Sequence, residues 1–434
     1  MDKRITILTW LFMLGAFWLP AQEETFTDYA IAAGQVTPLK SVEHIPASWW
    51  AWLDDTMEEV QILGLGEVSH YTRECYAYKR AIIEHLAKQG LLQALVLEVD
   101  FGQALFWNEY LLTGVGNPDS LVQKSGWFTY RTEEFRDLLV ALRKHNEQAE
   151  TPIQIFGMEM TTVQSNLEWM ERYVAESGLG TEELATQLEA ERTMVVFWEH
   201  DQTMIQGYWD LYYTLQGWLA SNAEALQRGQ GETTFANAER IVEIFRQYAT
   251  YVAQDDFSLQ VTLRDLFSTR NVAWVHQQLG EDARLAIWAH NGHVNLRSVR
   301  FGYPVLGEHL NRWYGEAYFA IGFTFGSGQF GSFSENDGFK IWTYEEAPEG
   351  SLQGKLGALS LGDVYMDIRR LLKEDRNLDS YLRSSILYRG DLGEFLANAD
   401  FQYTNPINLS STYDGLIYLH RTQAPTGLEW IRGN

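Results

Sequence analysis

Four short apolar segments of this sequence end in an acidic residue or a histidine. They run from Gln61 to Glu67, from Ala94 to Glu98, from Ile153 to Glu159 and from Arg284 to His290. Each has the length of a strand and precedes a segment with helical spacing, which is typical of a parallel sheet. Such sheets hold their ligands at the carboxyl ends of the strands. We therefore expect one group of side chains to meet at that edge: Glu67, His70, Glu98, Glu159, His290 and His293.

The spacing within two of these strand ends indicates proton-transfer chemistry. Glu67 lies three residues before His70, so its carboxylate can hold the imidazole in one tautomer while the ring takes a proton from water. A polar pair that caps the next helix is the alternative. His290 and His293 could bind a metal, polarise a carbonyl or protonate a leaving group. Their spacing is weak evidence for zinc, because Gly292 between them is typical of a loop.

Several other patterns exclude common kinds of site. No Gly-x-Ser-x-Gly elbow is present, and Ser69 lacks that context, which disfavours a serine hydrolase of the usual α/β type. Residues 326–331 match a dinucleotide-binding pattern, but residues 332–338 do not begin a helix, so we interpret the match as coincidence. Cys75 is the only cysteine, and we expect it to be buried and unreactive.

The elements around these residues predict an α/β fold with a mainly parallel central sheet flanked by helices. Between residues 163 and 278 strand signals are missing, which indicates a helical insertion subdomain. The α/β catalytic core then comprises residues 22–162 and 279–434. We expect further helices and strands at residues 72–88, 102–112, 132–146, 305–314, 318–325 and 415–420. The insertion is rich in aromatic residues that either pack its helices together or form a wall of a substrate cleft: Phe197, Trp198, Tyr208, Trp209, Tyr212, Tyr213 and Trp218.

Composition and charge limit the partners of the protein. The chain has 434 residues, 46% of them apolar, which is enough for a large core. Its 58 acidic and 33 basic residues give a net charge of −25, which disfavours nucleic acid as a partner. Met1 to Arg4, an apolar stretch to Leu19 and Pro20-Ala21-Gln22 have the pattern of a secretory signal. We expect residues 1–21 to be cleaved and the protein to be exported, periplasmic or secreted, without a stable membrane span.

The segment from Gly64 to His70, followed by Glu74 and Lys79-Arg80, resembles the opening motif of the erythromycin esterase family. The resemblance covers about residues 60–330 and the closing strand near residue 415. Further matches follow in the order of the family: Leu97-Glu98, Trp127 to Arg131, Leu142 to Asn146, Phe156 to Glu159, Leu263-Arg264-Asp265 with Asn271, Trp288 to His293, Leu306-Gly307, and Tyr314-Gly315.

The resemblance implies hydrolysis of an ester by water, without an acyl-enzyme; in the best-known members the ester is the lactone of a macrolide antibiotic. It makes His70 the general base, Glu67 its partner, and His290 and His293 further catalytic histidines. No cofactor or metal is implied.

Other positions support or modify this assignment. Glu74 is expected to support the site, and Lys79 stands where the family has a catalytic arginine, which Arg73 or Arg80 could replace. Tyr71 stands where relatives often have glycine and could narrow the cleft. The remaining residues with supporting or substrate-binding roles are Glu98, Glu159, Arg264 and Asp265.

Three hypotheses follow. The first is an exported, metal-independent esterase or lactonase that acts on a small-molecule ester or macrolide. The second is a metal-dependent hydrolase that uses His70, His290, His293 and a glutamate as ligands, since imidazole and carboxylate suit zinc. The third is a non-catalytic protein that binds aromatic or glycan ligands through the helical insertion.

Overall fold

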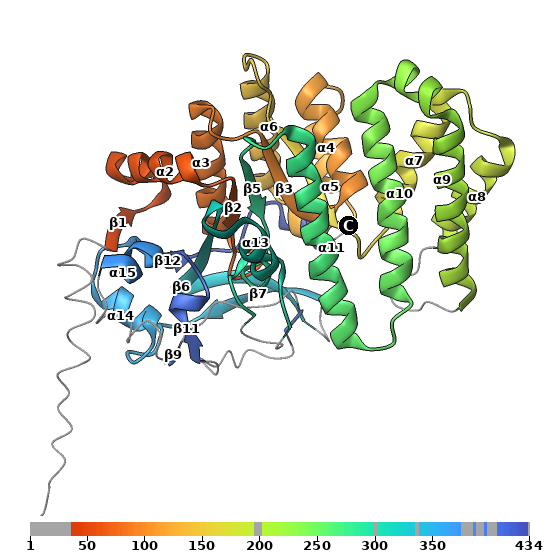
Figure 1. Ribbon diagram of the computed structural model, residues 1–434. Helices are drawn as coiled ribbons and strands as arrows, with labels where there is room; N and C mark the ends of the chain where they lie inside the picture. Colours follow the sequence, from red (N-terminus) through yellow and green to blue (C-terminus); the bar gives the residue numbers. More distant parts are fainter. Residues whose placement is uncertain are drawn as a thin grey trace, which may run out of the picture.

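The computed structural model describes residues 36–194, 202–298, 303–334, 338–374, 385–387, 395–396 and 406–432. The predicted signal segment, Phe197 and Trp198 lie outside the described residues. The predicted α/β class is confirmed, because helices flank a central sheet (Figure 1).

The central sheet is mainly parallel, as predicted. Its strands lie in the order β1-β8-β12-β6-β2-β5-β3-β4, and every neighbouring pair from β12 to β4 is parallel. β1, β7 and β8 add antiparallel pairs, and β10 pairs in parallel with β6. The strands of the sheet are β1 (Val36–Lys40), β2 (Ile62–Leu65), β3 (Ala94–Asp100), β4 (Gln154–Glu159), β5 (Leu285–Trp288), β6 (Tyr318–Ser334), β7 (Gly338–Tyr344), β8 (Asp363–Asp367), β10 (Phe395–Leu396) and β12 (Gly415–Thr422). A second, two-stranded sheet joins β9 (Ser385–Leu387) to β11 (Pro406–Asn408).

The strand register brings the predicted polar residues to one edge. Leu65 of β2 and Leu97 of β3 both lie opposite Trp288 of β5. Asp100 lies opposite Glu159, the last residue of β4. The residues that follow these positions therefore leave the sheet together at its carboxyl edge.

The alternation of side chains along each strand divides the core between the two faces of the sheet. Ile62 and Val96 pack into a cluster with α7, α9, α10, α11 and α13, whereas Leu63 and Leu97 pack into a cluster with α2, α3 and α6. This period of two is the pattern of strands buried on both faces. The helices are α2 (Ala47–Glu59), α3 (Arg73–Gln89), α4 (Phe101–Thr113), α5 (Pro118–Gln123), α6 (Glu133–Asn146), α7 (Gln164–Ser177), α8 (Glu182–Met194), α9 (Gln202–Gln230), α10 (Glu232–Val252), α11 (Phe257–Leu279), α12 (Asn291–Val294), α13 (Leu306–Tyr314), α14 (Leu352–Ala358), α15 (Ile368–Glu374) and α17 (Leu428–Arg432). Short 3₁₀ turns are η2 (Val42–His44), η3 (Phe128–Tyr130), η4 (Gly315–Ala317) and η5 (Leu409–Ser411).

Local sequence explains where the helices near the site begin and end. α3 ends at Gly90, whose φ of +71° is the left-handed conformation that glycine adopts readily. The side chains of Asp100 and Thr132 cap the first turns of α4 and α6 by accepting backbone N–H bonds. These caps fix helix starts directly beside the carboxyl edge of the sheet.

The segment predicted to be a helical insertion contains α7 to α11, and α8, α9 and α10 project to one side of the sheet (Figure 1). Of its aromatic residues, Tyr208 and Trp218 are buried and pack in its core, whereas Tyr213 is 60% exposed. The division of the chain into domains stays a prediction. Among the described residues, no helix combines the length and apolar character needed to cross a bilayer.

Two further expectations can be checked at this level. Residues 326–331 lie inside β6, which continues to Ser334, so no helix follows the glycine-rich pattern. Cys75 is fully buried on α3, and burial raises the pKa of its thiol, which removes it as a nucleophile at neutral pH.

Candidate active site

The loop after β2 carries a buried carboxylate that links three side chains. Glu67 accepts a hydrogen bond from His70 Nδ1 at 2.8 Å through one oxygen. Its other oxygen accepts bonds from Lys79 Nζ at 2.6 Å and from Trp288 Nε1 at 3.0 Å. The carboxylate bound at Nδ1 orients the His70 ring, and a proton taken from a substrate or from water would be held at Nε2.

Lys79 is the cation of this group, and it is fully buried on α3. Its Nζ lies 4.5 Å from the centroid of the Trp288 ring, so the indole supports the charge from one side. Burial raises the pKa of Glu67, but Lys79 and His70 outweigh that effect, and the pKa lies below its usual value. Burial lowers the pKa of Lys79, and Glu67 opposes that shift. Both groups are thus held in their charged forms as a pair.

The loop after β5 brings His290 beside His70. The two ring centroids are 5.1 Å apart. His290 caps the short helix α12 by accepting the Gly292 N–H at Nδ1 (3.1 Å), which assigns the proton of the neutral ring to Nε2. Its backbone N–H donates to Glu98 at 2.8 Å. The His70 and His290 loops are also joined directly, because the Asn291 N–H donates to the Glu67 carbonyl at 2.9 Å.

His293 differs from the other two histidines because two carboxylates bind it. Its Nδ1 lies 2.6 Å from Asp265 Oδ1, and its Nε2 lies 3.2 Å from Glu98 Oε1. Burial by itself lowers the pKa of His293, but the two carboxylates outweigh burial, and the pKa is raised to about 10. His293 is therefore an imidazolium at neutral pH and cannot serve as a base there.

Arg264, on α11, joins the ends of β3 and β4. Its guanidinium binds Glu98 Oε1 at 2.9 Å and Glu159 Oε1 at 2.7 Å. Burial opposes the ionisation of Glu98, yet His293, His70 and Arg264 hold its pKa well below the usual value. α11 is thereby fastened to the sheet edge by two adjacent residues, since Asp265 holds His293.

One group of donor atoms at this edge is close enough to hold a metal ion, but other side chains already bind each of them. Among the described residues, Glu98, Glu159 and His293 form the only group of three or more such side chains whose donor atoms all lie within 4.8 Å of one another. The guanidinium of Arg264 already bridges the two carboxylates, and the His293 ring is bound on both sides by Asp265 and Glu98. The ligand set of His70, His290 and His293 that the metal hypothesis requires is therefore not assembled.

Three positions from the resemblance lie apart from this cluster. Glu74 accepts the Gln423 backbone N–H at 2.8 Å, beside the end of β12. Arg73 is half exposed and donates to the Gln423 side chain at 2.9 Å. Arg80 pairs with Glu84 on the same helix. Neither arginine thus occupies the place of Lys79 at Glu67.

Tyr71 does not project into open space beside His70. Its side chain is fully buried, and its ring packs edge-on against Phe339 at 4.9 Å between centroids. It therefore belongs to an aromatic group formed with the β6–β7 hairpin.

Sequence reasoning missed three residues that organise the site. Trp288 lies just before the polar end of its strand. A tryptophan in a buried strand needs a hydrogen-bond acceptor for its indole N–H, and this requirement could have indicated its role from the sequence. Tyr76 Oη lies 2.5 Å from the carbonyls of both His70 and Thr129. Asp100 binds Thr162 and Trp127, and burial raises its pKa to about 6.

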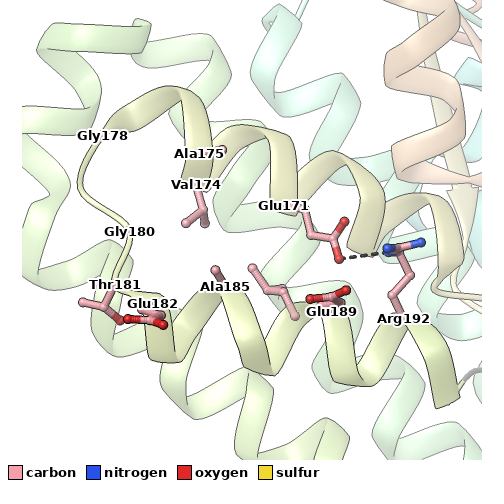
Figure 2. Close-up of a pocket in the computed structure, with 11 residues that line it drawn as sticks. Glu171, Val174, Ala175, Gly178, Gly180, Thr181, Glu182, Ala185, Glu189 and Arg192 are labelled. Carbon is pink, nitrogen blue, oxygen red and sulfur yellow. Dashed lines mark hydrogen bonds and ion pairs between the residues drawn. The ribbon is translucent and has the colours of Figure 1, made fainter.

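A separate pocket lies between α7 and α8 (Figure 2). It has a volume of about 450 Å³, and Glu171 and Arg192 form an ion pair of 3.0 Å at one end (Figure 2). None of the strand-end residues lines it. No histidine lines the pocket, whose titratable groups are Glu171, Glu182, Glu189 and Arg192. We therefore place the candidate chemistry at the sheet edge, where carboxylates pair with histidines.

The erythromycin esterase family model matches residues 92–422 of this chain. The chain belongs to the erythromycin esterase family. The matched region includes Glu98, Glu159, Arg264, His290 and His293, and it begins after the loop of Glu67 and His70. The family resemblance seen in the motifs is thereby confirmed.

Similar proteins extend this family relation over most of the chain. The putative hydrolase YbfO of Bacillus subtilis (strain 168) is 21% identical over 404 residues, which cover 85% of each chain. A solved protein of Bacillus cereus shares the fold with a TM-score of 0.76 and 22% identity, over 93% of this chain and 98% of that one. A mutant of the erythromycin esterase EreC in its open conformation has a TM-score of 0.65 and 16% identity, over 90% of this chain and 98% of that one. A solved succinoglycan biosynthesis protein has a TM-score of 0.72 and 20% identity, over 93% of this chain and 99% of that one.

Proposed function

We propose that this erythromycin esterase family member hydrolyses a carboxylic ester or macrolactone with water that His70 activates. The observation that carries the proposal is the chain Lys79–Glu67–His70, with contacts of 2.6 and 2.8 Å, beside the ring of His290. A buried carboxylate on Nδ1 orients the imidazole and stabilises its protonated form, which is what a general base requires.

The proposed reaction balances without a cofactor. Nε2 of His70 takes a proton as the water oxygen attacks the acyl carbon, and the proton then passes to the alcohol oxygen as the C–O bond breaks. His290, whose ring is adjacent, would donate a hydrogen bond from Nε2 to the oxygen that gains charge. Lys79 is buried and cannot touch substrate, so we assign it a positioning role through Glu67.

The second group at the edge would supply electrostatic stabilisation. The His293 imidazolium and the Arg264 guanidinium both bind Glu98 beside the His290 loop, and both side chains are partly exposed. Both are held in place by carboxylates, so they would not need to reorganise as negative charge grows on the substrate.

The test compares wild type with His70→Ala. Each is treated with a chelator, incubated with macrolides and simple alkyl esters, and analysed for a mass gain of one water. We expect His70→Ala to lose roughly a hundredfold or more in rate. The matched control is His85→Ala, since His85 is another partly buried histidine bound to a carboxylate, Asp54, at 2.7 Å. Near-normal turnover in His70→Ala would remove His70 from the mechanism, and no product from any ester would remove the esterase proposal.

We also propose that the protein is exported, on the basis of the basic, apolar and small-residue pattern of its first 22 residues. The test is expression in a bacterium, followed by fractionation and N-terminal sequencing. A mature chain that begins near residue 22 outside the cytoplasm is the expected result. An intact Met1 in the cytoplasmic fraction would contradict it.

A further inference from the structure

Four aromatic side chains from three separate segments meet beside the general-base loop. Tyr71 follows His70, Phe128 begins η3, and Phe333 and Phe339 belong to the β6–β7 hairpin. Ring centroids are 4.9 Å apart for Tyr71 and Phe339, 5.4 Å for Phe333 and Phe339, and 5.8 Å for Phe128 and Phe333. We call these four residues the aromatic cluster.

The aromatic cluster is tied to His70 by backbone contacts as well as by neighbouring rings. The Tyr71 and His70 ring centroids are 6.4 Å apart. Tyr76 Oη holds the carbonyls of His70 and Thr129 together, and Thr129 follows Phe128. The hairpin is attached in turn, because the Gly331 N–H donates to the Tyr71 carbonyl at 2.8 Å. The position of the cluster relative to His70 is therefore fixed.

The outer members of the aromatic cluster present apolar surface to solvent. Tyr71 is fully buried, Phe333 and Phe339 are partly exposed, and Phe128 is 40% exposed. Arg131 stacks on Phe128 with its guanidinium carbon 4.3 Å from the ring centroid, and Arg131 Nε is itself anchored to the Ser125 carbonyl at 2.7 Å. Phe128 is thus held rigidly although much of its ring is uncovered.

The polar part of the site has little capacity to bind substrate by charge. Its carboxylates Glu67, Glu98, Glu159 and Asp265 are each bound to Lys79, Arg264 or His293. The four carboxylates exceed these three cations by one negative charge, so the group does not attract an anionic substrate, and a neutral ester gains little from charge of either sign. Binding energy for an ester must then come mainly from apolar contact, and a rigid, half-open aromatic surface next to the base is suited to that role.

From this arrangement we propose that the aromatic cluster is a subsite for the apolar portion of the substrate, an alkyl or aromatic group next to the ester bond, with Phe128 as a specificity-determining residue. This inference rests on the proposed esterase function and adds the substrate class. Contact between Phe128 and an alkyl chain of several carbons should raise kcat/KM by roughly tenfold.

The experiment measures kcat/KM for ethyl acetate and ethyl octanoate with wild type, Phe128→Ala and the control Tyr213→Ala. Tyr213 is another exposed aromatic residue, on α9. We expect wild type to prefer the octanoate, and Phe128→Ala to lower kcat/KM for the octanoate by roughly tenfold while the acetate and the control stay unchanged. Equal losses on both esters, or no loss on the octanoate, would overturn the subsite.

A binding measurement separates failure of the subsite from failure of the esterase proposal. Calorimetry with octanoate and acetate needs no turnover and uses the same three proteins. Octanoate binding that Phe128→Ala weakens and Tyr213→Ala does not would support the subsite even if no ester were cleaved. Octanoate that binds no better than acetate to wild type would overturn it, even if wild type were an active esterase.

Discussion

The buried pair of Lys79 and Glu67 allows the sharpest test of how this site is held together. Replacing Lys79 with Met keeps an unbranched apolar side chain on α3 but removes the charge that lies 2.6 Å from Glu67 and 4.5 Å from the centroid of the Trp288 ring. Glu67 is then a buried carboxylate without a lysine partner, and breaking one side of a buried pair costs about 3–5 kcal/mol of stability. We expect Lys79→Met to lower the free energy of unfolding by this amount.

The same change should also lower activity, because an unpaired Glu67 takes up a proton and no longer supports the His70 imidazolium. Loss of one charge-assisted hydrogen bond is worth about 1.5–3 kcal/mol, which corresponds to roughly a 10- to 150-fold fall in kcat/KM. The His70 side chain itself is not altered, so the substrate KM should change far less than kcat.

A double-mutant cycle tests the reasoning. Glu67→Gln removes the partner charge, so the variant with both substitutions should regain stability relative to Lys79→Met, with a coupling energy of about 2–3 kcal/mol in denaturant unfolding. Activity should not return, because Glu67 is the anion that His70 requires. Lys88→Met, on the exposed end of the same helix, is the control for losing a lysine charge. A cost of less than about 1 kcal/mol for Lys79→Met, or a double variant no more stable than the single one, would refute the coupling of Lys79 and Glu67.

Three further predictions concern groups around this pair. The pKa of His293 is raised to about 10, so the stability that its ion pairs contribute, on the order of 5 kcal/mol, is complete below pH 6.5 and is lost as the pH rises through about 10. The melting temperature should therefore fall more steeply between pH 6.5 and 10 for wild type than for Asp265→Asn. Equal slopes for the two proteins would refute this. Burial raises the pKa of Asp100 to about 6, so its ionisation destabilises the folded protein as the pH rises from 4 to 6. In Asp100→Asn the free energy of unfolding should fall less over this pH range, by up to about 3 kcal/mol. An unchanged pH profile would contradict the shift. Trp288→Phe removes the indole N–H that donates a hydrogen bond to Glu67 at 3.0 Å, and it should lower kcat roughly tenfold or more. A variant with full activity would show that this bond is dispensable.

Much of the sheet could be predicted from the sequence because the local residue pattern of its central strands is sufficient to identify them. Runs such as Ala94 to Glu98 are apolar on both faces and end in a charge, so both the strand and its polar end are visible without a partner. The short antiparallel strands β1 and β8 were missed. Each has only five residues, and their pairing joins segments more than 300 residues apart.

The sequence by itself determined which residues gather at the carboxyl edge, because strand direction brings the end of every parallel strand to the same side. Only the tertiary structure decided how their charges pair. Lys79 points inward to Glu67 from a helix face, and Arg264 reaches Glu98 across 166 residues of chain. These contacts depend on how α3 and α11 pack against the sheet, and side-chain pairing at 2.6 to 2.9 Å cannot be predicted from spacing in the sequence alone. That packing separates His70, which a single carboxylate orients, from His293, which two carboxylates keep protonated.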